Sequence, residues 1–292
     1  MRLLAVLLIV AILLPISTIA QTSKQTSFYS SGSAATVLIE EHTATYCTTC
    51  AEIDPMLLNF LEDNGNRAIR IAIHPPGEDP LGSEISTHRL ALHGDQLAVT
   101  PTFFMDGNLV SQGFVDRVDM QMNLRSSEIV KEGLTSIIGE VNVNQNSINV
   151  SSPGLILGVE ERLTIFIIER QVSLDPGTAQ NGLDNNHDVA RAMVSLDYWG
   201  NTSAEILPTG WYSHVHDGEG PSVAFFVDQM DPFSYDVVLV LERNEGGAGS
   251  VLSSTLIVLS ESSEPSKNIS TVLVVAALVF TSIAIFTIQS RR

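Results

Sequence analysis

The spacing of apolar residues predicts alternating strands and helices over the first half of the chain. The segments "ATVLIEEHT" (35–43) and "RAIRIAIH" (67–74) are short, apolar and rich in β-branched residues, which predicts two buried strands. Between them, apolar positions recur at helical spacing from Met56 to Leu61 and stop at Gly65. This half therefore begins as a strand, a helix that starts near a pair of cysteines, and a second strand.

The same half continues with a further alternation of elements. A short helical pattern covers residues 83–92, and "PTFFMDGNLVSQG" (101–113) reads as two strands joined at an Asp-Gly dipeptide, which is typical of tight hairpin turns. Another helix is expected over residues 116–138. The order strand, helix, strand, helix, hairpin, helix indicates one α/β layer domain over residues 35–138.

From residue 139 onward the pattern changes to short β-rich runs. About seven such runs are separated by Gly, Pro, Asn and Asp, a spacing that is typical of antiparallel sandwiches. The pattern therefore predicts an all-β, sandwich-like domain over residues 139–260.

Two apolar segments flank these domains. Residues 1–20 combine one basic residue, an apolar run and a small residue at position 20, the layout of a signal peptide cleaved after Ala20, with an uncleaved anchor helix as the alternative. Residues 269–288 contain no charge and no proline and are long enough to cross a bilayer as a transmembrane helix. The segments beside them are a flexible lead-in, a polar stalk and a basic cytoplasmic tail, at 21–34, 261–268 and 289–292.

These ends predict a single-pass protein of the cell membrane, with its N-terminal ectodomain outside and a short C-terminal tail in the cytoplasm. The formal net charge of −18 over 292 residues leaves no basic stripe for a nucleic-acid partner. It also suits a solvated surface outside the cell. Asn149, Asn201 and Asn268 each begin an Asn-x-Ser/Thr triplet and are candidate glycosylation sites outside the cell.

Cys47 and Cys50 are the only cysteines of the chain, and their spacing allows three interpretations. A zinc site would need two more ligands, such as His88 and His93, which are distant in sequence. A structural staple of so small a loop would gain little from chain entropy. Redox chemistry gives the spacing a reason, because a helix N-terminus favours the Cys47 thiolate while Cys50, one turn on, can resolve a mixed disulfide. Outside the cell the two should form a disulfide.

Two other segments have residues that could bind metal. His214 and His216 alternate at strand spacing before Asp217, although such a pair is more often a solvated strand end. The loop "LDPGTAQNGLDNNHD" (174–188) is rich in Asp and Asn but lacks the spacing of an EF-hand, so a turn-rich connection accounts for it. We therefore expect no metal site.

Residues 35–138 resemble a thioredoxin-like domain. The strand "VLIEEH" leads to an aromatic Tyr46 and then "CTTC", as in thioredoxins. Glu41 stands six residues before Cys47, where the family keeps a buried carboxylate that moves protons. On a regular strand Glu41 shares a face with Val37 and Ile39, which favours it over the adjacent Glu40 as the buried residue. Pro55 falls where the family's helix is kinked. Thr100, Pro101 and Thr102 resemble the loop in which a cis-proline holds the substrate backbone.

The arrangement of leader, thioredoxin-like domain and β-rich domain also resembles bacterial and archaeal surface proteins of the outer-membrane-antigen type. The segments "VLIEEHTATYC", "VTPTFFMDG" and "NNHDVARAMV" (185–194) are similar to that family's. The expected fold class is therefore an α/β thioredoxin-like domain, then an all-β, sandwich-like domain, then a C-terminal transmembrane helix.

The resemblance implies a membrane-tethered thiol-disulfide oxidoreductase that acts on protein thiols or disulfides. Cys47 would attack, Cys50 would resolve, Glu41 would assist proton transfer, and Pro101 would position a substrate that also contacts Tyr46, Thr100 and Thr102. No cofactor is expected, and the redox partner is not implied. Thr48 and Thr49 replace the family's usual dipeptides, so the direction of electron transfer stays open. The alternative is a cell-surface binding protein in which this domain is a scaffold and the β-rich domain recognises a partner.

Overall fold

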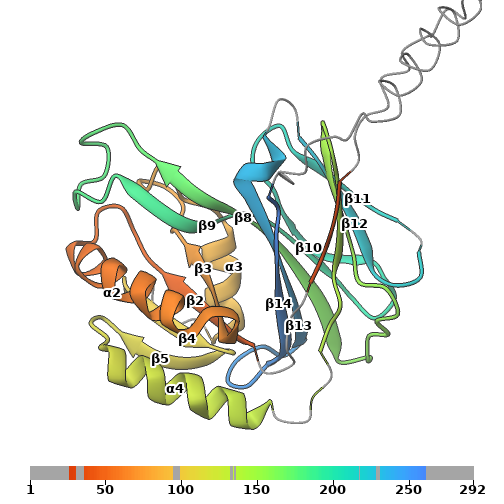
Figure 1. The fold of residues 1–292 in the computed structure, drawn as a ribbon, viewed down its shortest axis with the longest axis horizontal. Coiled ribbons are helices and arrows are strands. Elements are labelled where there is room, and N and C mark those ends of the chain that lie inside the picture. The colour runs from red at the N-terminus through yellow and green to blue at the C-terminus, as the bar shows by residue number, and fades with distance from the viewer. Residues whose placement is uncertain are drawn as a thin grey trace, which may run out of the picture. The chain divides into compact units, whose positions relative to one another are not determined.

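The strands of the protein form two sheets (Figure 1). The computed structural model describes residues 26–30, 36–94, 99–131, 134, 136–216, 218–227 and 231–260. The described residues up to Leu259 belong to one compact unit. Its larger sheet has nine strands in the order β14-β13-β8-β9-β3-β2-β4-β5, with β10 paired to β9, and its smaller sheet has five in the order β1-β6-β7-β12-β11.

The first half of the chain supplies one end of the larger sheet together with the helices. β2 and β3 are parallel neighbours joined through α2, and β4 and β5 form a hairpin antiparallel to β2. Helices α2 and α4 pack on one face of these strands, through a core that includes Ile53, Leu57 and Met120. The elements are β2 Val37–His42, α2 Thr48–Asn64, η1 Gly65–Arg67, β3 Ala68–Ile73, α3 Ile85–Leu92, β4 Thr102–Met105, β5 Asn108–Gln112 and α4 Arg117–Val130.

The second half supplies the other end of the larger sheet and most of the smaller one. Long strands β8, β9, β13 and β14 pair antiparallel and pack against the smaller sheet around a core of aliphatic side chains. The elements are β6 Glu140–Asn144, β7 Ser147–Ser151, β8 Glu161–Ser173, β9 Asn185–Leu196, β10 Thr202–Ile206, β11 Tyr212–Val215, β12 Ser222–Phe226, η2 Pro232–Ser234, β13 Tyr235–Arg243 and β14 Val251–Val258. The remaining strand of the smaller sheet, β1 Thr26–Tyr29, comes from the start of the chain and pairs with β6.

The two halves meet in a parallel pairing between β3 and β9, where Ala72 lies opposite Val189. A shared core continues across this junction: Leu38 and Ile71 of the first half pack in one cluster with Phe166 and Val238 of the second. β9 thus lies beside the edge of β3 that an isolated strand–helix–strand unit would leave exposed, and joins the two sets of strands into one sheet.

The predicted fold class is wrong. The described part of the chain is mainly β-sheet. The strands expected in an α/β domain (35–138) share the larger sheet with five strands of the expected separate sandwich (139–260), β8, β9, β10, β13 and β14, and one core cluster crosses between them. Apolar periodicity identified the individual elements but holds no information on which strand edges meet. The helix expected over residues 116–138 ends at Val130.

The predicted membrane segments fall at the two ends of the chain. Residues 1–20 and 269–288 lie outside the described residues. Among the helices that the structure describes, none combines the length and the apolar character needed to span a membrane.

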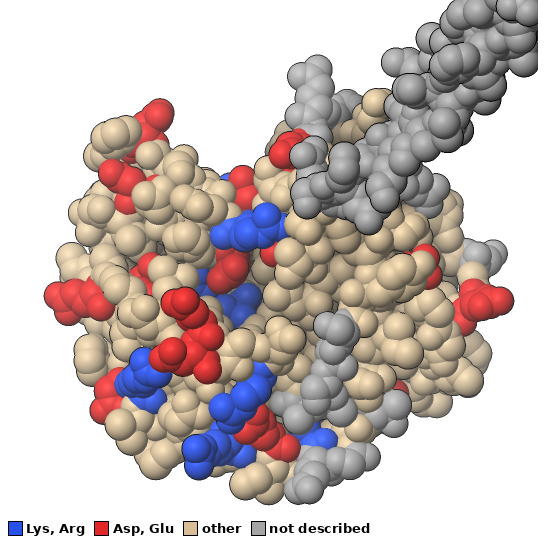
Figure 2. Space-filling model, viewed as in Figure 1, with Lys and Arg blue, Asp and Glu red and all other residues tan. Residues whose placement is uncertain are grey.

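Charged side chains are unevenly distributed over the surface. Figure 2 shows that on one face they gather over the half that holds α2 and α4, with both signs interleaved, whereas the packed β-sheets show few. Two ion pairs tie the neighbourhood of α2 to α4, Arg67 with Glu128 and Arg117 with Asp63. Both are partly exposed, so each contributes little to stability.

A buried ion network crosses the junction between the halves. Arg89 of α3 lies 2.7 Å from Glu40 of β2 and 2.8 Å from Glu242 of β13, and all three side chains are almost fully buried. Glu242 also accepts hydrogen bonds from Arg162 and Thr164 of β8. Burial alone would raise the pKa of Glu40, but Arg89 and His93 hold it well below its usual range. Arg89 therefore bridges two carboxylates from different halves of the chain.

Replacing Arg89 should destabilise the whole unit. Arg89→Met leaves Glu40 and Glu242 buried without their shared partner, and we expect a loss of about 3–5 kcal/mol in the free energy of unfolding, measured by urea denaturation. Arg117→Met, which removes the exposed pair with Asp63, should cost less than about 1 kcal/mol. Two separate unfolding transitions in the wild-type protein, or equal effects of the two variants, would contradict the single-unit architecture.

Candidate functional site

The two cysteines form a disulfide at the N-terminus of α2. Their sulfur atoms are bonded, and Cys47 is the N-cap residue, whose Sγ accepts a hydrogen bond from the backbone N–H of Cys50 at 3.1 Å. Cys47 is 8% exposed and Cys50 is 2% exposed. The free N–H groups and the dipole of a helix N-terminus favour negative charge, so the position suits a Cys47 thiolate once the disulfide is reduced.

The turn that leads into the cysteines is anchored to the end of β3. The backbone N–H of Thr43 donates to the carbonyl of Ile73, and the N–H of Thr45 donates to Asp79 Oδ2 at 2.8 Å. The ring of His74, which directly follows β3, lies 3.1 Å from the same carboxylate oxygen. Burial would raise the pKa of Asp79, but His74 and the backbone donors lower it, so Asp79 is an anionic anchor for the cysteine turn.

A loop from the second half of the chain also holds this turn. The side-chain amide of Asn181, between β8 and β9, donates to the carbonyls of Ala44 and Cys47 at 3.2 and 3.1 Å, and its backbone N–H donates to the carbonyl of Thr45 at 2.9 Å. Sequence analysis missed Asn181, because it lies in a turn-rich segment that nothing in the local pattern connects to the cysteines. The cysteine site is thus assembled from both halves.

Glu41 lies on the face of β2 that packs against α2, as the alternation predicted. It is 3.4 Å from Arg70 of β3, which also contacts Asp54 of α2 at 2.9 Å and Asp188 of β9 at 3.0 Å. Glu40 points to the opposite face, into the Arg89 network. One guanidinium therefore serves three carboxylates, and Glu41 has the longest contact and the most buried side chain of the three.

Because three carboxylates share the single positive charge of Arg70, Glu41 can hold a proton near neutral pH. Burial raises the pKa of Glu41 to about 7, against the opposing charge of Arg70 and with the help of Asp54 and Asp188. A carboxyl with such a pKa exists in both protonation states at neutral pH, which is the property that a proton-transfer group needs. Pro55 lies within α2, where the resemblance places it.

The predicted substrate-contacting residues lie at the same end of β2. The Thr100–Pro101 peptide bond is cis, and Thr102 begins β4 opposite His42, the last residue of β2. Pro101 is buried, and its carbonyl accepts a hydrogen bond from Gly113. Thr102 is also buried and donates through Oγ1 to the carbonyl of Val99. Its hydroxyl is therefore engaged within the protein.

Tyr46 is the exposed member of the cysteine turn. It is 41% exposed, and burial together with Asp79 and Glu78 raises the pKa of its hydroxyl. Tyr46 therefore presents a neutral aromatic surface beside Cys47, as a substrate-contacting role requires.

The alternative metal sites gain no support from the geometry. His93 is buried, stacked on Phe104 and 3.2 Å from Glu40, so it belongs to the ion network rather than to an exposed helix face. The rings of His214 and His216 lie 4.8 Å apart on an exposed strand end, and Asp217 lies outside the described residues. Throughout the described segments, no group of three or more His, Cys, Asp or Glu side chains is arranged to hold a metal ion.

The candidate glycosylation sites differ in accessibility. Asn201 is exposed in the turn between β9 and β10. Asn149 is half-buried in β7, and its amide donates to the carbonyl of Asn142 and the hydroxyl of Ser147. Asn268 lies outside the described residues. Their glycosylation stays a prediction.

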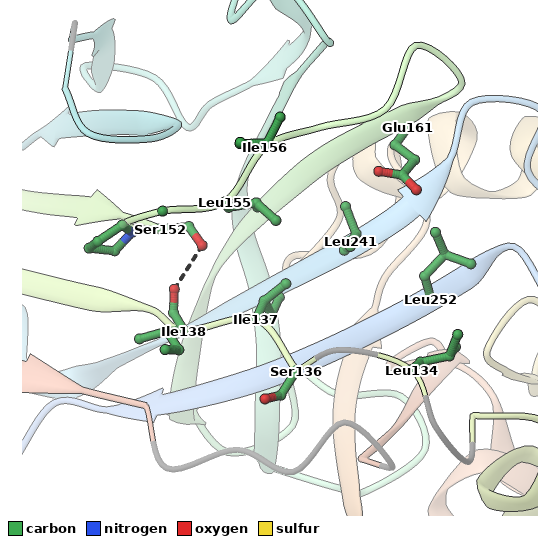
Figure 3. Close-up of a pocket in the computed structure, with 12 residues that line it drawn as sticks. Leu134, Ser136, Ile137, Ile138, Ser152, Leu155, Ile156, Glu161, Leu241 and Leu252 are labelled. Carbon is green, nitrogen blue, oxygen red and sulfur yellow. Dashed lines mark hydrogen bonds between the residues drawn. The ribbon is translucent and has the colours of Figure 1, made fainter.

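A cavity of about 490 Å³ beside β13 and β14 is lined mainly by apolar side chains (Figure 3). Ser152 Oγ donates to the carbonyl of Ile138 at 2.7 Å, and Glu161 accepts from the N–H of Gly158 at 2.8 Å. Glu161 is the charged residue of the lining, and its carboxylate is already engaged by the backbone N–H of Gly158. This cavity offers no group of reactive side chains.

Comparisons with known proteins add little to this geometry. No protein-family model matches the chain, and no curated protein matches it. Among solved structures, the crystal structure of protein AGR_C_4864 from Agrobacterium tumefaciens is similar over 78% of this chain and 96% of that chain, with 12% sequence identity and a TM-score of 0.49. A similarity at this level carries no argument about fold or function, so the site must be interpreted from its own residues.

The raised pKa of Glu41 predicts a pH dependence of stability. The folded protein keeps the Glu41 proton up to about pH 7, whereas the unfolded chain loses it near the ordinary pKa of 4.5, so the folded state binds more protons in between. The free energy of unfolding should therefore fall as pH rises through this window, by on the order of 3 kcal/mol from this group.

Glu41→Gln should remove that fall, as measured by urea denaturation at a series of pH values. Glu62→Gln, at an exposed carboxyl of α2, is the matched control and should run parallel to the wild-type curve. A Glu41→Gln curve that also runs parallel to wild type would show that Glu41 is ionised throughout.

Proposed function

We propose that this protein is a thiol-disulfide oxidoreductase that exchanges disulfides with cysteines of other proteins outside the cytoplasm. The observation that supports this most is the Cys47–Cys50 disulfide at the N-terminus of α2, with Cys47 as the N-cap. A purely structural bridge of this spacing would gain little chain entropy, so its place at a helix N-terminus is better explained by reactivity.

The two cysteines differ in a way that assigns their roles. Cys47 is the more exposed of the pair, it lies beside the exposed Tyr46, and its sulfur already accepts the Cys50 N–H. The same hydrogen bond would stabilise a thiolate in the reduced protein. Cys50 is nearly inaccessible, so substrates meet Cys47 and Cys50 acts only within the protein.

The exchange transfers two electrons between the cysteine pair and a substrate disulfide. In the reducing direction, the Cys47 thiolate attacks a substrate disulfide, a Cys47–substrate disulfide forms, and the first substrate sulfur leaves and takes up a proton. The Cys50 thiolate then attacks Cys47 Sγ, which forms the Cys47–Cys50 disulfide and releases the second substrate thiol. The substrate disulfide is reduced and the protein pair is oxidised; the oxidising direction is the reverse. A second thiol-disulfide couple restores the starting state.

Glu41 supports the second step. Cys50 must lose its proton before it can attack, and its buried surroundings disfavour a thiolate. Glu41 lies on the face of β2 that packs against α2, the helix that carries Cys50, and its pKa of about 7 suits it to accept that proton at neutral pH and return it in the reverse direction. The sulfur atoms carry the electrons, so the proposal includes no cofactor.

The location is part of the same proposal and rests on the sequence. The leader-like segment 1–20 favours export, and a protein disulfide persists in an oxidising compartment. The negative net charge suits proteins rather than nucleic acids as partners.

Trapping mixed disulfides tests this proposal. In Cys50→Ser the mixed disulfide with Cys47 cannot be resolved, so incubation with disulfide-containing proteins should yield covalent adducts that are visible by non-reducing gel electrophoresis and disappear on reduction. Cys47→Ser is the matched control and should give fewer than about a tenth as many, because Cys50 is shielded. Equal trapping by both variants would overturn the assigned roles, and no trapping by either would favour the surface binding protein.

A further inference from the structure

A cavity of about 570 Å³ lies where the two halves of the protein meet. One wall is the segment from Pro76 to Glu84, which follows β3. The opposite wall comes from the second half: Ala190 and Arg191 of β9, the segment 206–211 after β10, and Tyr235 of β13. Ala190 directly follows Val189, the residue that pairs with β3.

This cavity adjoins the cysteine site through one shared residue. Asp79 is part of the cavity wall, and its carboxylate binds the N–H of Thr45, two residues before Cys47. The cysteine turn leaves the carboxyl end of β2 and the cavity wall leaves the carboxyl end of β3, so both lie at the same edge of these parallel strands. Binding sites of parallel sheets are commonly found at this edge.

The lining combines apolar side chains with loop backbone. Trp211 and Tyr235 meet edge to face with ring centroids 5.7 Å apart, and Leu81 and Leu207 add aliphatic surface. At Gly82 a Cβ would lie 2.3 Å from the carbonyl oxygen of Pro75, so this tight turn of the cavity wall requires glycine. The aromatic side chains in the wall suit an apolar or aromatic side chain of a polypeptide ligand.

The charges of the lining favour a neutral side chain in the ligand. Arg191 of β9 and Glu169 of β8 lie 2.8 Å apart and are both partly buried, so they compensate each other. Asp79 is engaged with His74 and with backbone donors. The remaining charged residue of the lining, Glu84, is exposed and therefore solvated, whereas an apolar or aromatic side chain of the ligand could pack on Trp211.

We infer that this cavity is a substrate subsite of the cysteine centre, which binds an apolar or aromatic residue of the polypeptide segment that contains the reacting cysteine. The inference rests on the proposed function. It also assigns a role to the second half of the chain, which supplies the recognition surface for chemistry that the first half performs.

Paired substrates and paired tryptophan variants test the subsite. The reduced protein is given a small symmetric disulfide, a disulfide-linked peptide with Trp near the cysteine, and the same peptide with Ser in place of Trp. In the wild type the Trp peptide should have the lowest KM. Trp211→Ala should raise that KM about tenfold and leave the rate with the small disulfide unchanged. Trp199→Ala, at a surface residue that is 77% exposed, is the matched control and should change neither.

A second variant keeps the test valid if Trp211→Ala disturbs folding. Thr209→Trp adds bulk at the exposed rim of the cavity without removing a core contact, and it should raise the same KM. Equal KM values for the Trp and Ser peptides in the wild type, or a KM that neither cavity variant changes, would overturn the subsite while leaving the exchange activity intact. Failure of the wild-type protein to reduce even the small disulfide would overturn the proposed function itself.

Discussion

The buried guanidinium of Arg89 is the constraint on which the rest of the structure depends. It binds both Glu40 of β2 and Glu242 of β13, and so connects carboxylates from the two halves of the chain. Removing this guanidinium from the folded unit would leave both carboxylates buried without it, a penalty that the loss of an exposed ion pair does not impose. The pairing of β3 with β9 and the core around Phe166 and Val238 lie at the same junction between the two halves of the chain.

Because the halves are held in one unit, the cysteine site draws on both. α2 provides the helix N-terminus, β2 provides Glu41, and the loop between β8 and β9 provides Asn181, which binds the carbonyls of Ala44 and Cys47. Asp188 of β9 adds negative charge around Arg70 and so helps to raise the pKa of Glu41. The second half therefore influences both the geometry and the protonation of the site that we propose for exchange.

Sequence patterns predicted what is local and missed what depends on distant contacts. The strands at β2 and β3, the helix that starts at the cysteines, and the burial of Glu41 on the α2 face follow from periodicity and alternation. The separation into two domains was wrong, because a period of two identifies a strand but not its neighbour. Asn181 lies 134 residues from Cys47 and Glu242 lies 153 residues from Arg89, beyond the range of any local pattern.

The central claim is that the Cys47 position favours a thiolate, and the pKa of that thiol tests it most directly. In the Cys50→Ser variant Cys47 is the only cysteine, so the rate of its alkylation as a function of pH reports this pKa alone. The helix N-terminus and the backbone N–H of residue 50 should hold the pKa clearly below the value of about 8.5 for free cysteine. A pKa at or above that value would show that the pair is a structural bridge and would contradict the proposed exchange chemistry.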